Sequence, residues 1–484
     1  MSRSILAFVL LFLFTLSCNR VQSEEGYVEA EISSKGLDFL KNLLLEKAES
    51  SLITLQLPRI EKSVKIPILG NVDAVLSNIT IERIHVNKST LQTGDTGIVM
   101  DVSGVFVNLT MNWKYSYRTW LLPISVFDKG TATVRVEGLE VGLSLSLMTI
   151  HGSPKLSLLD CGCYMDDVSI HLDGGSSWFY QGLVDAFEDK ISSAVEDAVS
   201  KKIKDAVAKL ESSLLSLPKE IPVTDIAILN VTFIDDPVLS ESSVELKING
   251  LVSSKDGVEL LNHYHKLSHD SVSCNLEDKM TKFSIHEDVI KSASSVYFEA
   301  GKMQWMVDKL PDQSLLNTAE WRFIIPRLYK KYPNRDMNLN ISISSLPIVK
   351  VGEQNIKATI PLNLVIDVLD EEELIQVACI SMMIDVSVVA EISRNAVTGN
   401  IKLNKFSLSL EWSNIGELHM HLIQTFMSTL LKTAVLPYLN LKLLEGYVLP
   451  AFHGYELQDT QILYADSWIV ICSNVGTAKQ FNLI

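Results

Sequence analysis

The sequence predicts an α+β protein made of antiparallel sheets and a few long amphipathic helices, arranged in two similar halves. Three observations support this fold class. Much of the chain alternates apolar and polar residues, as half-buried strands do. One apolar stripe, Leu183 to Leu214, belongs to a stretch of roughly 40 residues with helical spacing. The order helix, strands, long helix, strand then recurs along the chain.

The composition is that of a folded chain with an acidic balance. Of 484 residues, 47% are hydrophobic and 21% are charged, which excludes an intrinsically disordered polyanion. Lys and Arg number 42 against 58 Asp and Glu, so the formal net charge is −16. Sequence-independent nucleic-acid binding needs Lys and Arg to replace phosphate counterions, so we expect no nucleic-acid partner. The length allows two large domains or three ordinary ones.

Residues 1–23 are predicted to be a secretory signal peptide. Arg3 is a short positive start, and Ile5 to Leu16 is an apolar run too short to span a bilayer. Val21 and Ser23 fit the −3 and −1 positions of a cleavage site. Removal of Arg3 and Arg20 would change the charge from −16 to −18. No later run reaches the roughly 18 uncharged apolar residues of a membrane span, so we expect a soluble, secreted, extracellular protein.

Five Asn-x-Ser/Thr sequons fit such a location. Together with the signal peptide they predict N-glycans at some of these sites, which are Asn78, Asn87, Asn108, Asn230 and Asn340.

The cysteines indicate a fold held by its core. Cys18 lies in the signal peptide, which leaves Cys161, Cys163, Cys274, Cys379 and Cys472. Five is odd, so at least one thiol stays free or pairs between chains. The Cys161-x-Cys163 pair could be half of a metal site, but no second Cys pair or His-x-x-x-His motif accompanies it, so we expect no metal.

Three segments illustrate the strand pattern. Val134 to Leu147 alternates with one slip near Gly138, which predicts a long strand with a bulge. Leu339 to Ile343 alternates without a slip, and Ile401 to Leu410 slips once. The polar positions carry Ser, Asn, Lys and Glu, which is typical of antiparallel sheets with one face on a core.

Two helices are predicted in the first half. One has apolar residues at helical spacing from Leu37 to Leu52 and ends before Pro58. The other begins after Gly174-Gly175, with Ser176 or Ser177 as N-cap, and ends before Pro218. At 1.5 Å per residue it would be about 60 Å long, so its domain must be elongated unless the helix kinks. A coiled coil is the alternative, but the stripe is too wide for an a/d seam.

The second half repeats this order. A helix is expected from Ser284 to Gly301, and another from Ile415 to Leu444 with an interruption at Pro437. The offsets are roughly 250 and 240 residues, which indicates a degenerate internal repeat. We therefore expect an N-terminal domain over 24–254, a linker over 255–280 and a C-terminal domain over 281–484.

Two polar segments outside this pattern are expected to be structural rather than functional. His263-Tyr264-His265 with His269 and Asp270 could bind Zn or Cu, but a solvated linker is the favoured interpretation. Asp370 to Glu373 lies between two strands and is expected to form a hairpin tip.

No motif for catalysis is present. The sequence has no Gly-x-Ser-x-Gly, no His-Glu-x-x-His, no phosphate-binding Gly loop and no dinucleotide fingerprint. Asp166-Asp167 and Asp235-Asp236 are adjacent pairs, and adjacent strand side chains point to opposite faces. We expect no cofactor and no enzymatic activity, and a hydrolase remains the least supported alternative.

One segment combines aromatic and basic residues. Trp113 to Trp120 reads Trp-Lys-Tyr-Ser-Tyr-Arg-Thr-Trp and separates two strand-like stretches. It could be a hairpin at a domain tip, where Trp and Tyr suit a membrane–water interface and Lys and Arg suit anionic head groups. Aromatic packing within an ordinary strand is the alternative.

Several segments resemble the bactericidal/permeability-increasing protein and lipopolysaccharide-binding protein family over nearly the whole mature chain. In the first half they are Ala30 to Asp38, with Glu31 where the family usually has Arg, Val64 to Gly70, Asn112-Trp113-Lys114 with Arg118, and Cys161 to Leu172. In the second half they are Leu403 to Gly416 and Val435 to Pro450. The Cys-Gly-Cys and Gly-Gly-Ser-Ser-Trp-Phe-Tyr details suggest a plant-type branch.

The resemblance implies an elongated boomerang of two similar domains. Each would be a twisted antiparallel β-barrel packed with a long helix, and a central sheet would join them. Each would hold acyl chains of lipopolysaccharide or phospholipid in an apolar groove. Together with the aromatic segment, the resemblance gives five head-group tip candidates: Lys65, Trp113, Lys114, Arg118 and Trp120.

Two departures from the family stand out. Its disulfide joins a Cys at the position of Cys161 to the long helix, but Ser200 to Lys204 contains no Cys, so the partner of Cys161 is undefined. The tip is also less basic, since other residues stand where bactericidal relatives tend to carry Lys: Pro67, Asn71, Asn112, Tyr117 and Leu122.

Two functions fit the resemblance. One is a secreted protein that binds lipopolysaccharide in innate defence or sensing of bacteria. The other is a phospholipid carrier or transfer protein with no antimicrobial role, which contacts membrane surfaces transiently. The acidic charge favours the carrier over direct killing by attraction to an anionic surface. The sequence leaves the lipid, the receptor and the oligomeric state open.

Overall fold

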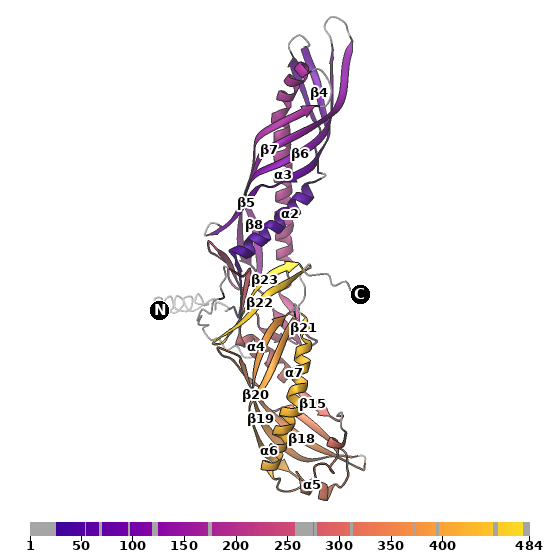
Figure 1. Ribbon diagram of the computed structural model, residues 1–484, viewed down its shortest axis with the longest axis vertical. Coiled ribbons are helices and arrows are strands. Elements are labelled where there is room, and N and C mark those ends of the chain that lie inside the picture. The colour runs from indigo at the N-terminus through magenta and orange to yellow at the C-terminus, as the bar shows by residue number, and fades with distance from the viewer. Residues whose placement is uncertain are drawn as a thin grey trace, which may run out of the picture.

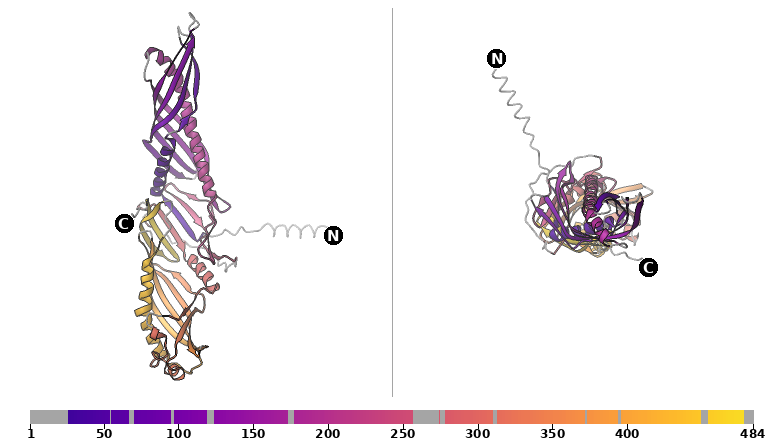
Figure 2. Two further views of the ribbon diagram at one scale, coloured as in Figure 1. Left: turned by 90° about the vertical axis from the view of Figure 1, so that its right-hand side faces the viewer. Right: turned by 90° about the horizontal axis from the view of Figure 1, so that it is seen from above.

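The computed structural model describes residues 26–53, 55–66, 70–94, 97–118, 124–172, 177–256, 274, 278–309, 313–371, 373–393, 396–448 and 454–477. The two halves of the chain occupy opposite ends of an elongated molecule (Figure 1). A view along the long axis shows how narrow the molecule is (Figure 2). The predicted elongated shape is therefore confirmed.

A seven-stranded antiparallel sheet forms most of the N-terminal half. Its path runs β2-β4-β6-β7-β8, and β3 and β5 pair with β4 and β6. The strands are β2 (Gln56–Leu57), β3 (Ile60–Ile66), β4 (Gly70–His85), β5 (Lys88–Gly94), β6 (Gly97–Arg118), β7 (Ser125–Ile150) and β8 (Ser153–Leu172). The bulge predicted near Gly138 is confirmed, because the β6–β7 register slips between Val105/Leu139 and Val107/Val136, and Gly138 has a φ of 68°.

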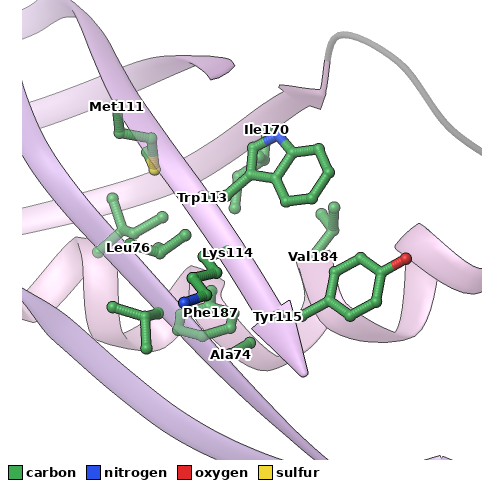
Figure 3. A pocket seen from close by; sticks show the side chains of 11 residues that line it. Ala74, Leu76, Met111, Trp113, Lys114, Tyr115, Ile170, Val184 and Phe187 are labelled. Atoms are coloured by element: carbon green, nitrogen blue, oxygen red, sulfur yellow. The ribbon is translucent and has the colours of Figure 1, made fainter. Parts of the chain in front are cut away.

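Helix α3 (Ser177–Leu215) covers the inner face of this sheet. It contacts β8 at one sheet edge and β2 and β3 at the other. Its buried side chains Phe187, Ile191, Val195 and Val199 join the largest apolar core of the molecule. Figure 3 shows Val184 and Phe187 of α3 across from Leu76 and Met111 of the sheet. The long helix, predicted from its stripe, is confirmed at 39 residues.

Two polar contacts hold α3 at the sheet edges. The Lys62 ammonium of β3 donates to the Ala186 carbonyl at 2.6 Å, and Lys155 of β8 lies 3.6 Å from Glu211. Each is partly exposed and contributes about 1 kcal/mol or less, so apolar burial supplies most of the attachment.

Helix α2 (Ser34–Leu52) packs beside the strands. Ser33 is its N-cap and accepts from the Gly36 amide at 3.2 Å. Glu49 accepts from the Val86 amide at 3.0 Å, which ties the helix to the sheet. A Cβ at Gly36 would lie 2.3 Å from the Met280 carbonyl oxygen, so only glycine allows this contact with the second half. The predicted helix over 37–52 is confirmed.

A second seven-stranded sheet forms the C-terminal half. Its path runs β15-β16-β18-β19-β20-β21, with β17 paired to β18. The strands are β15 (Gln304–Val307), β16 (Met337–Ile343), β17 (Ile348–Val351), β18 (Ile356–Asp370), β19 (Glu373–Ser393), β20 (Ala396–Ser413) and β21 (Tyr447–Val448). Asp370 and Glu373 flank the β18–β19 turn, so the predicted hairpin tip is confirmed.

The C-terminal helical layer differs from the expectation in its start, which is Met420 rather than Ile415, and in the position of its irregular segment. It consists of α6 (Met420–Leu430), a π-helical segment (Leu431–Val435) and α7 (Leu436–Glu445). The helix was expected to be interrupted at Pro437, but Pro437 lies in the first turn of α7 and the irregular segment precedes it. Proline lacks an amide hydrogen, and the preceding π-helical turn absorbs the altered hydrogen-bond pattern. A short helix, α5 (Pro326–Lys331), lies at the far end.

A central six-stranded sheet joins the halves in the order β11-β12-β1-β14-β23-β22. Its strands are β11 (Val238–Leu239), β12 (Ser243–Ile248), β1 (Val28–Ser33), β14 (Thr281–His286), β23 (Trp468–Thr477) and β22 (Tyr455–Ala465). The β1–β14 pair is the seam between halves, and Glu31 and Lys282 form an ion pair across it at 3.2 Å. Beside it lie the small sheet of β13 (Val252–Ser254), β10 (Ala227–Asn230) and β9 (Glu220–Pro222), and helix α4 (Glu287–Glu299).

The helix order supports the predicted repeat. Helices α2 and α4 each follow a strand of the central sheet, and α3 and the α6–α7 layer each precede a return to strands. The candidate metal ligands from His263 to Asp270 lie outside the described residues.

A disulfide closes the central region. Cys274 is bonded to Cys472 of β23, with a Cα–Cα distance of 6.4 Å and a sequence separation of 198 residues. Cys161, Cys163 and Cys379 are free thiols. Cys161, the disulfide candidate from the sequence, is therefore not bonded.

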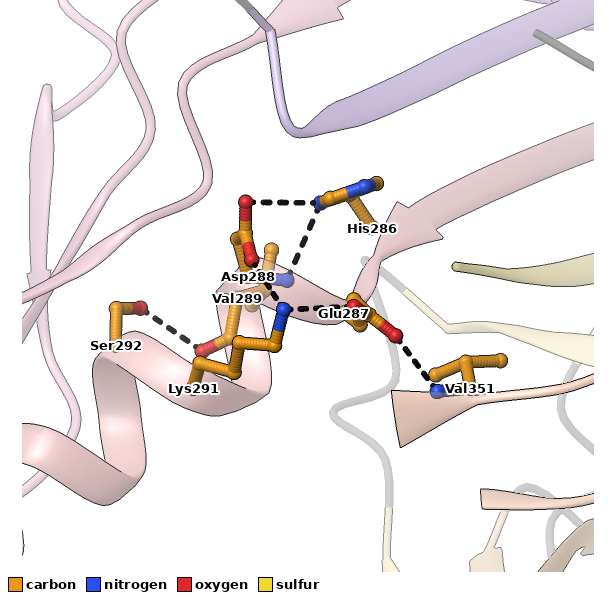
Figure 4. A network of polar contacts seen from close by, with 7 residues as sticks. All are labelled: His286, Glu287, Asp288, Val289, Lys291, Ser292 and Val351. Carbon is orange, nitrogen blue, oxygen red and sulfur yellow. Dashed lines mark hydrogen bonds and ion pairs between the residues drawn. The ribbon is translucent and has the colours of Figure 1, made fainter. Parts of the chain in front are cut away.

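Polar contacts at the start of α4 tie this helix to β17 of the C-terminal sheet (Figure 4). Glu287 accepts from Lys291 at 2.6 Å and from the Val351 amide of β17 at 2.7 Å. His286 Nδ1 lies 3.2 Å from the Asp288 amide and 3.3 Å from its carboxylate. The contact between His286 and the Asp288 carboxylate is the largest cause that lowers the pKa of Asp288 to about 2. Lys291 lowers this pKa further, while burial acts in the opposite direction.

Loss of the disulfide should destabilise the central region. Replacing Cys274 and Cys472 by Ala removes the crosslink of a long loop, so we expect a cost of about 2–5 kcal/mol and a lower Tm. Reductant should lower the Tm of the unaltered protein but not that of the double variant. Replacing Cys161 and Cys163 by Ala is the control for thiol removal, and an equal Tm in both double variants would contradict the assignment.

Acid should weaken the polar contacts of Asp288 at the start of α4. The pKa of Asp288 is lower in the folded chain, at about 2, than its ordinary value of 3.8. Its contribution, about 2 kcal/mol, is therefore complete above pH 4 and is lost as the pH falls towards 2. Asp288→Asn should raise the pH midpoint of acid unfolding, followed by circular dichroism. The exposed Asp205 provides the control, and equal midpoints for D288N and D205N would refute the proposed role of Asp288.

Candidate functional site

An apolar cavity lies between α3 and the sheet, near the distal end of the N-terminal half. Its volume is about 40 Å³. Strands β4, β6 and β8 and helix α3 supply its lining, which is Ala74, Val75, Leu76, Met111, Trp113, Lys114, Tyr115, Ile170, Val184, Phe187 and Ile191 (Figure 3). Apart from Lys114 and the Tyr115 hydroxyl, these side chains are apolar or aromatic, which suits a hydrocarbon rather than a polar ligand.

Trp113 lies inside the domain. Its side chain is 7% exposed, and its indole nitrogen donates to the Thr131 carbonyl of β7 at 2.9 Å. Tyr115 stacks on it at 5.8 Å between centroids, and Tyr117 stacks on Tyr115 at 6.4 Å. The proposal of Trp113 as a surface head-group contact is therefore wrong, because strand alternation turns it inward with Met111 and Tyr115. Trp120 lies outside the described residues.

The three cationic candidates do share a surface. Lys114 and Arg118 alternate with the inward aromatics on β6, and both are exposed. Lys65 is exposed on β3 and pairs with Asn71 of β4. The next residue of β4, Val72, pairs with Tyr117 of β6, so Lys65 lies near Arg118. All three therefore lie on the outer face of the sheet, with Lys65 and Arg118 nearer its end.

This outer face also contains residues that the sequence reading missed. Phe127 is 69% exposed, and Lys129 pairs with Lys114 across β6 and β7. The alternation of side chains along β7 could have predicted that Phe127 points outward. It lies two residues from Lys129 and pairs with Ser116 of β6. Asp73 and Glu61 are exposed among the cations, so the surface is mixed in charge rather than strongly basic.

The free thiols give no sign of a reactive centre. Burial, with smaller contributions from Glu196 and Cys161, raises the pKa of Cys163 to about 12, and burial raises the pKa of Cys161. Thiols with raised pKa values are poor nucleophiles and poor metal ligands at neutral pH. Among the described residues there is no group of three or more His, Cys, Asp and Glu that could hold a metal ion.

The sequons differ in accessibility. Asn78, Asn87 and Asn108 are exposed in the N-terminal half, whereas Asn230 and Asn340 are half-buried. Asn230 also accepts hydrogen bonds from the amide and the hydroxyl of Thr232. The three exposed sites are therefore the better candidates for glycans.

No helix in the described ranges combines the length and apolar character needed to cross a membrane.

Known proteins resemble this chain over nearly its whole length. A putative BPI/LBP family protein of Arabidopsis thaliana is 50% identical over 469 residues, which are 97% of this chain and 96% of the relative. A bactericidal permeability-increasing protein of Sebastes schlegelii is 25% identical, covering 98% of each chain. A lipopolysaccharide-binding protein of Bos taurus is 23% identical, covering 96% of each. The plant relative agrees with the expected plant-type branch.

The fold has a solved counterpart. A crystal structure of lipopolysaccharide binding protein superposes with a TM-score of 0.64 and 20% identity, covering 94% of this chain and 100% of that one. At that identity the likeness shows the fold alone. Sequence profiles give the family: the LBP / BPI / CETP N-terminal domain matches residues 36–216, and the C-terminal domain matches 222–476. The chain therefore belongs to the LBP / BPI / CETP family.

Proposed function

We propose that this protein binds amphiphilic lipids, with an acyl chain between α3 and the N-terminal sheet and the anionic head group at the outer distal surface. The observation that carries the proposal is the apolar cavity lined by β4, β6, β8 and α3. It lies directly under the strand whose outward residues are Lys114 and Arg118. One short stretch of β6 thus offers contacts to both ends of an amphiphile.

Hydrocarbon burial is the expected source of affinity. Each buried CH₂ contributes about 0.8 kcal/mol, so micromolar binding, which needs about 8 kcal/mol, requires the burial of about ten methylenes. A cavity of about 40 Å³ has room for only a chain end, so a longer chain requires the seam between α3 and the sheet to widen. The partly exposed contacts Lys62–Ala186 and Lys155–Glu211 offer little resistance to such widening.

The outer distal surface suits a phosphate-bearing head group at an interface. Lys65, Lys114, Arg118 and Lys129 supply cations, and Phe127 is an exposed aromatic that can enter the edge of a lipid layer. The relatives named for lipopolysaccharide binding make that amphiphile a candidate ligand, together with phospholipid. Secretion, with a signal peptide over 1–23, and domains over 24–254 and 281–484 form part of the same proposal.

A phospholipid carrier is the second candidate. The mixed charge of the outer surface, with Asp73 and Glu61 among the cations, favours it over direct bactericidal action. A defence role would act through recognition of lipopolysaccharide rather than through charge attraction alone. Binding of purified lipopolysaccharide and of host-type phospholipid vesicles at equal ionic strength distinguishes the two.

Charge reversal at the distal surface should weaken binding. The double variant Lys114→Glu/Arg118→Glu should bind anionic phospholipid vesicles and lipopolysaccharide at least about tenfold more weakly at low salt, because each cation near an anionic surface contributes about 1 kcal/mol. The difference should shrink as salt is added. Titration calorimetry or vesicle co-sedimentation measures it.

The matched control is Lys201→Glu/Lys202→Glu on the exposed side of α3, which changes the net charge by the same amount. Its affinity should stay closer to that of the unaltered protein. Equal losses in both double variants would show that net charge alone matters, and no loss in either would rule out the distal surface.

A further inference from the structure

Gly130 of β7 lies directly opposite Trp113 of β6. A Cβ built on Gly130 would come within 2.5 Å of Cζ2, 2.7 Å of Cε2 and 3.0 Å of Nε1 of the indole. Carbon atoms in proteins do not approach this closely, so the indole occupies space that any other residue at position 130 would fill. The ring therefore lies flat against β7 only because position 130 is glycine.

Two further contacts fix the ring in this position. The indole nitrogen donates to Thr131, the neighbour of Gly130, and the Tyr115 ring stacks on the indole with an interplanar angle of 5°. The opposite side of the cavity is formed by Phe187 and Ile191, of which Ile191 is fully buried. Trp113 is thus the one large side chain of the lining that is held back against a strand by a missing Cβ.

We infer that the Gly130–Trp113 pair sets the usable depth of the acyl-chain site, and that Trp113 selects ligands by acyl-chain length. This inference rests on the proposed function, since it assigns a specificity-determining residue to the same cavity. The ligand class is a lipid that inserts the end of an acyl chain beside the indole. Met111, which lies two residues before Trp113 on the same face of β6, also lines the cavity.

The expected dependence on chain length follows from burial. Each methylene that enters the cavity should raise affinity about fourfold, which is the factor for 0.8 kcal/mol, until the chain meets the wall. Beyond that length additional methylenes stay outside and affinity levels off. The chain length at which it levels off therefore measures the depth of the site.

Two substitutions should move this length in opposite directions. Trp113→Phe removes part of the ring and the bond to Thr131, so the site deepens and affinity should rise over one to a few further methylenes. Gly130→Ala forces the indole away from β7 into the cavity, so affinity should level off at a shorter chain. A smaller residue at 113 would leave a larger void at greater cost in stability, and Phe is therefore the better first variant.

The test uses lysophosphatidylglycerols that share one head group and differ only in acyl length, from about 8 to about 18 carbons, below their micelle concentrations. Affinities come from titration calorimetry, and the Tm of each variant verifies folding. Gly142→Ala is the matched control, since Gly142 also lies in β7 and its added Cβ would meet only Asp101 Oδ1, at 3.5 Å. G142A should level off at the same length as the unaltered protein.

The outcomes separate the inference from the proposed function. A longer limit in W113F and a shorter one in G130A, with G142A unchanged, support the inference. A chain-length limit that is identical in all four folded proteins overturns the role of Trp113 but leaves lipid binding intact. Absence of any chain-length dependence in the unaltered protein overturns the proposed function itself.

Discussion

The N-terminal half depends on one constraint: one long helix, α3, with only the end of α2 beside it, must cover the inner face of a seven-stranded sheet. No other sheet of the described chain packs on that face, so the strands curve around α3 until β8 and β2–β3 reach it from both sides. A helical cylinder cannot fill a curved sheet evenly. Larger side chains such as Phe187 close most of the space, and the remainder is the cavity beside Trp113. The proposed site is thus a consequence of the architecture.

The periodicity of apolar residues allowed the architecture to be predicted from the sequence. The uninterrupted stripe on α3, the slip at Gly138 and the repeated helix order each depend on local residue pattern, and the structure agrees with all three. Contacts between segments far apart in the sequence could not be predicted from local patterns. The Cys274–Cys472 bond joins residues 198 apart, and no local pattern indicates which of five thiols will meet.

The aromatic segment on β6 shows where prediction from local patterns fails. Alternation separates Trp113 from Lys114 correctly, but it does not say which face is buried when one face is aromatic and the other is cationic. The answer depends on α3, whose side chains arrive more than 70 positions later in the chain, and on Gly130, which accommodates the indole. Phe127 was missed for the same reason, since its exposure follows from the β6–β7 register.

The central claim is that an acyl chain enters the space between α3 and the N-terminal sheet. The most direct measurement uses a phospholipid with a photoactivatable diazirine near the end of its acyl chain, followed by peptide mapping of the crosslinked protein. The account predicts label on the β6 segment from Met111 to Tyr115 and on the α3 segment from Val184 to Ile191, the two sides of the cavity. Label confined to exposed residues or to the C-terminal half would contradict it.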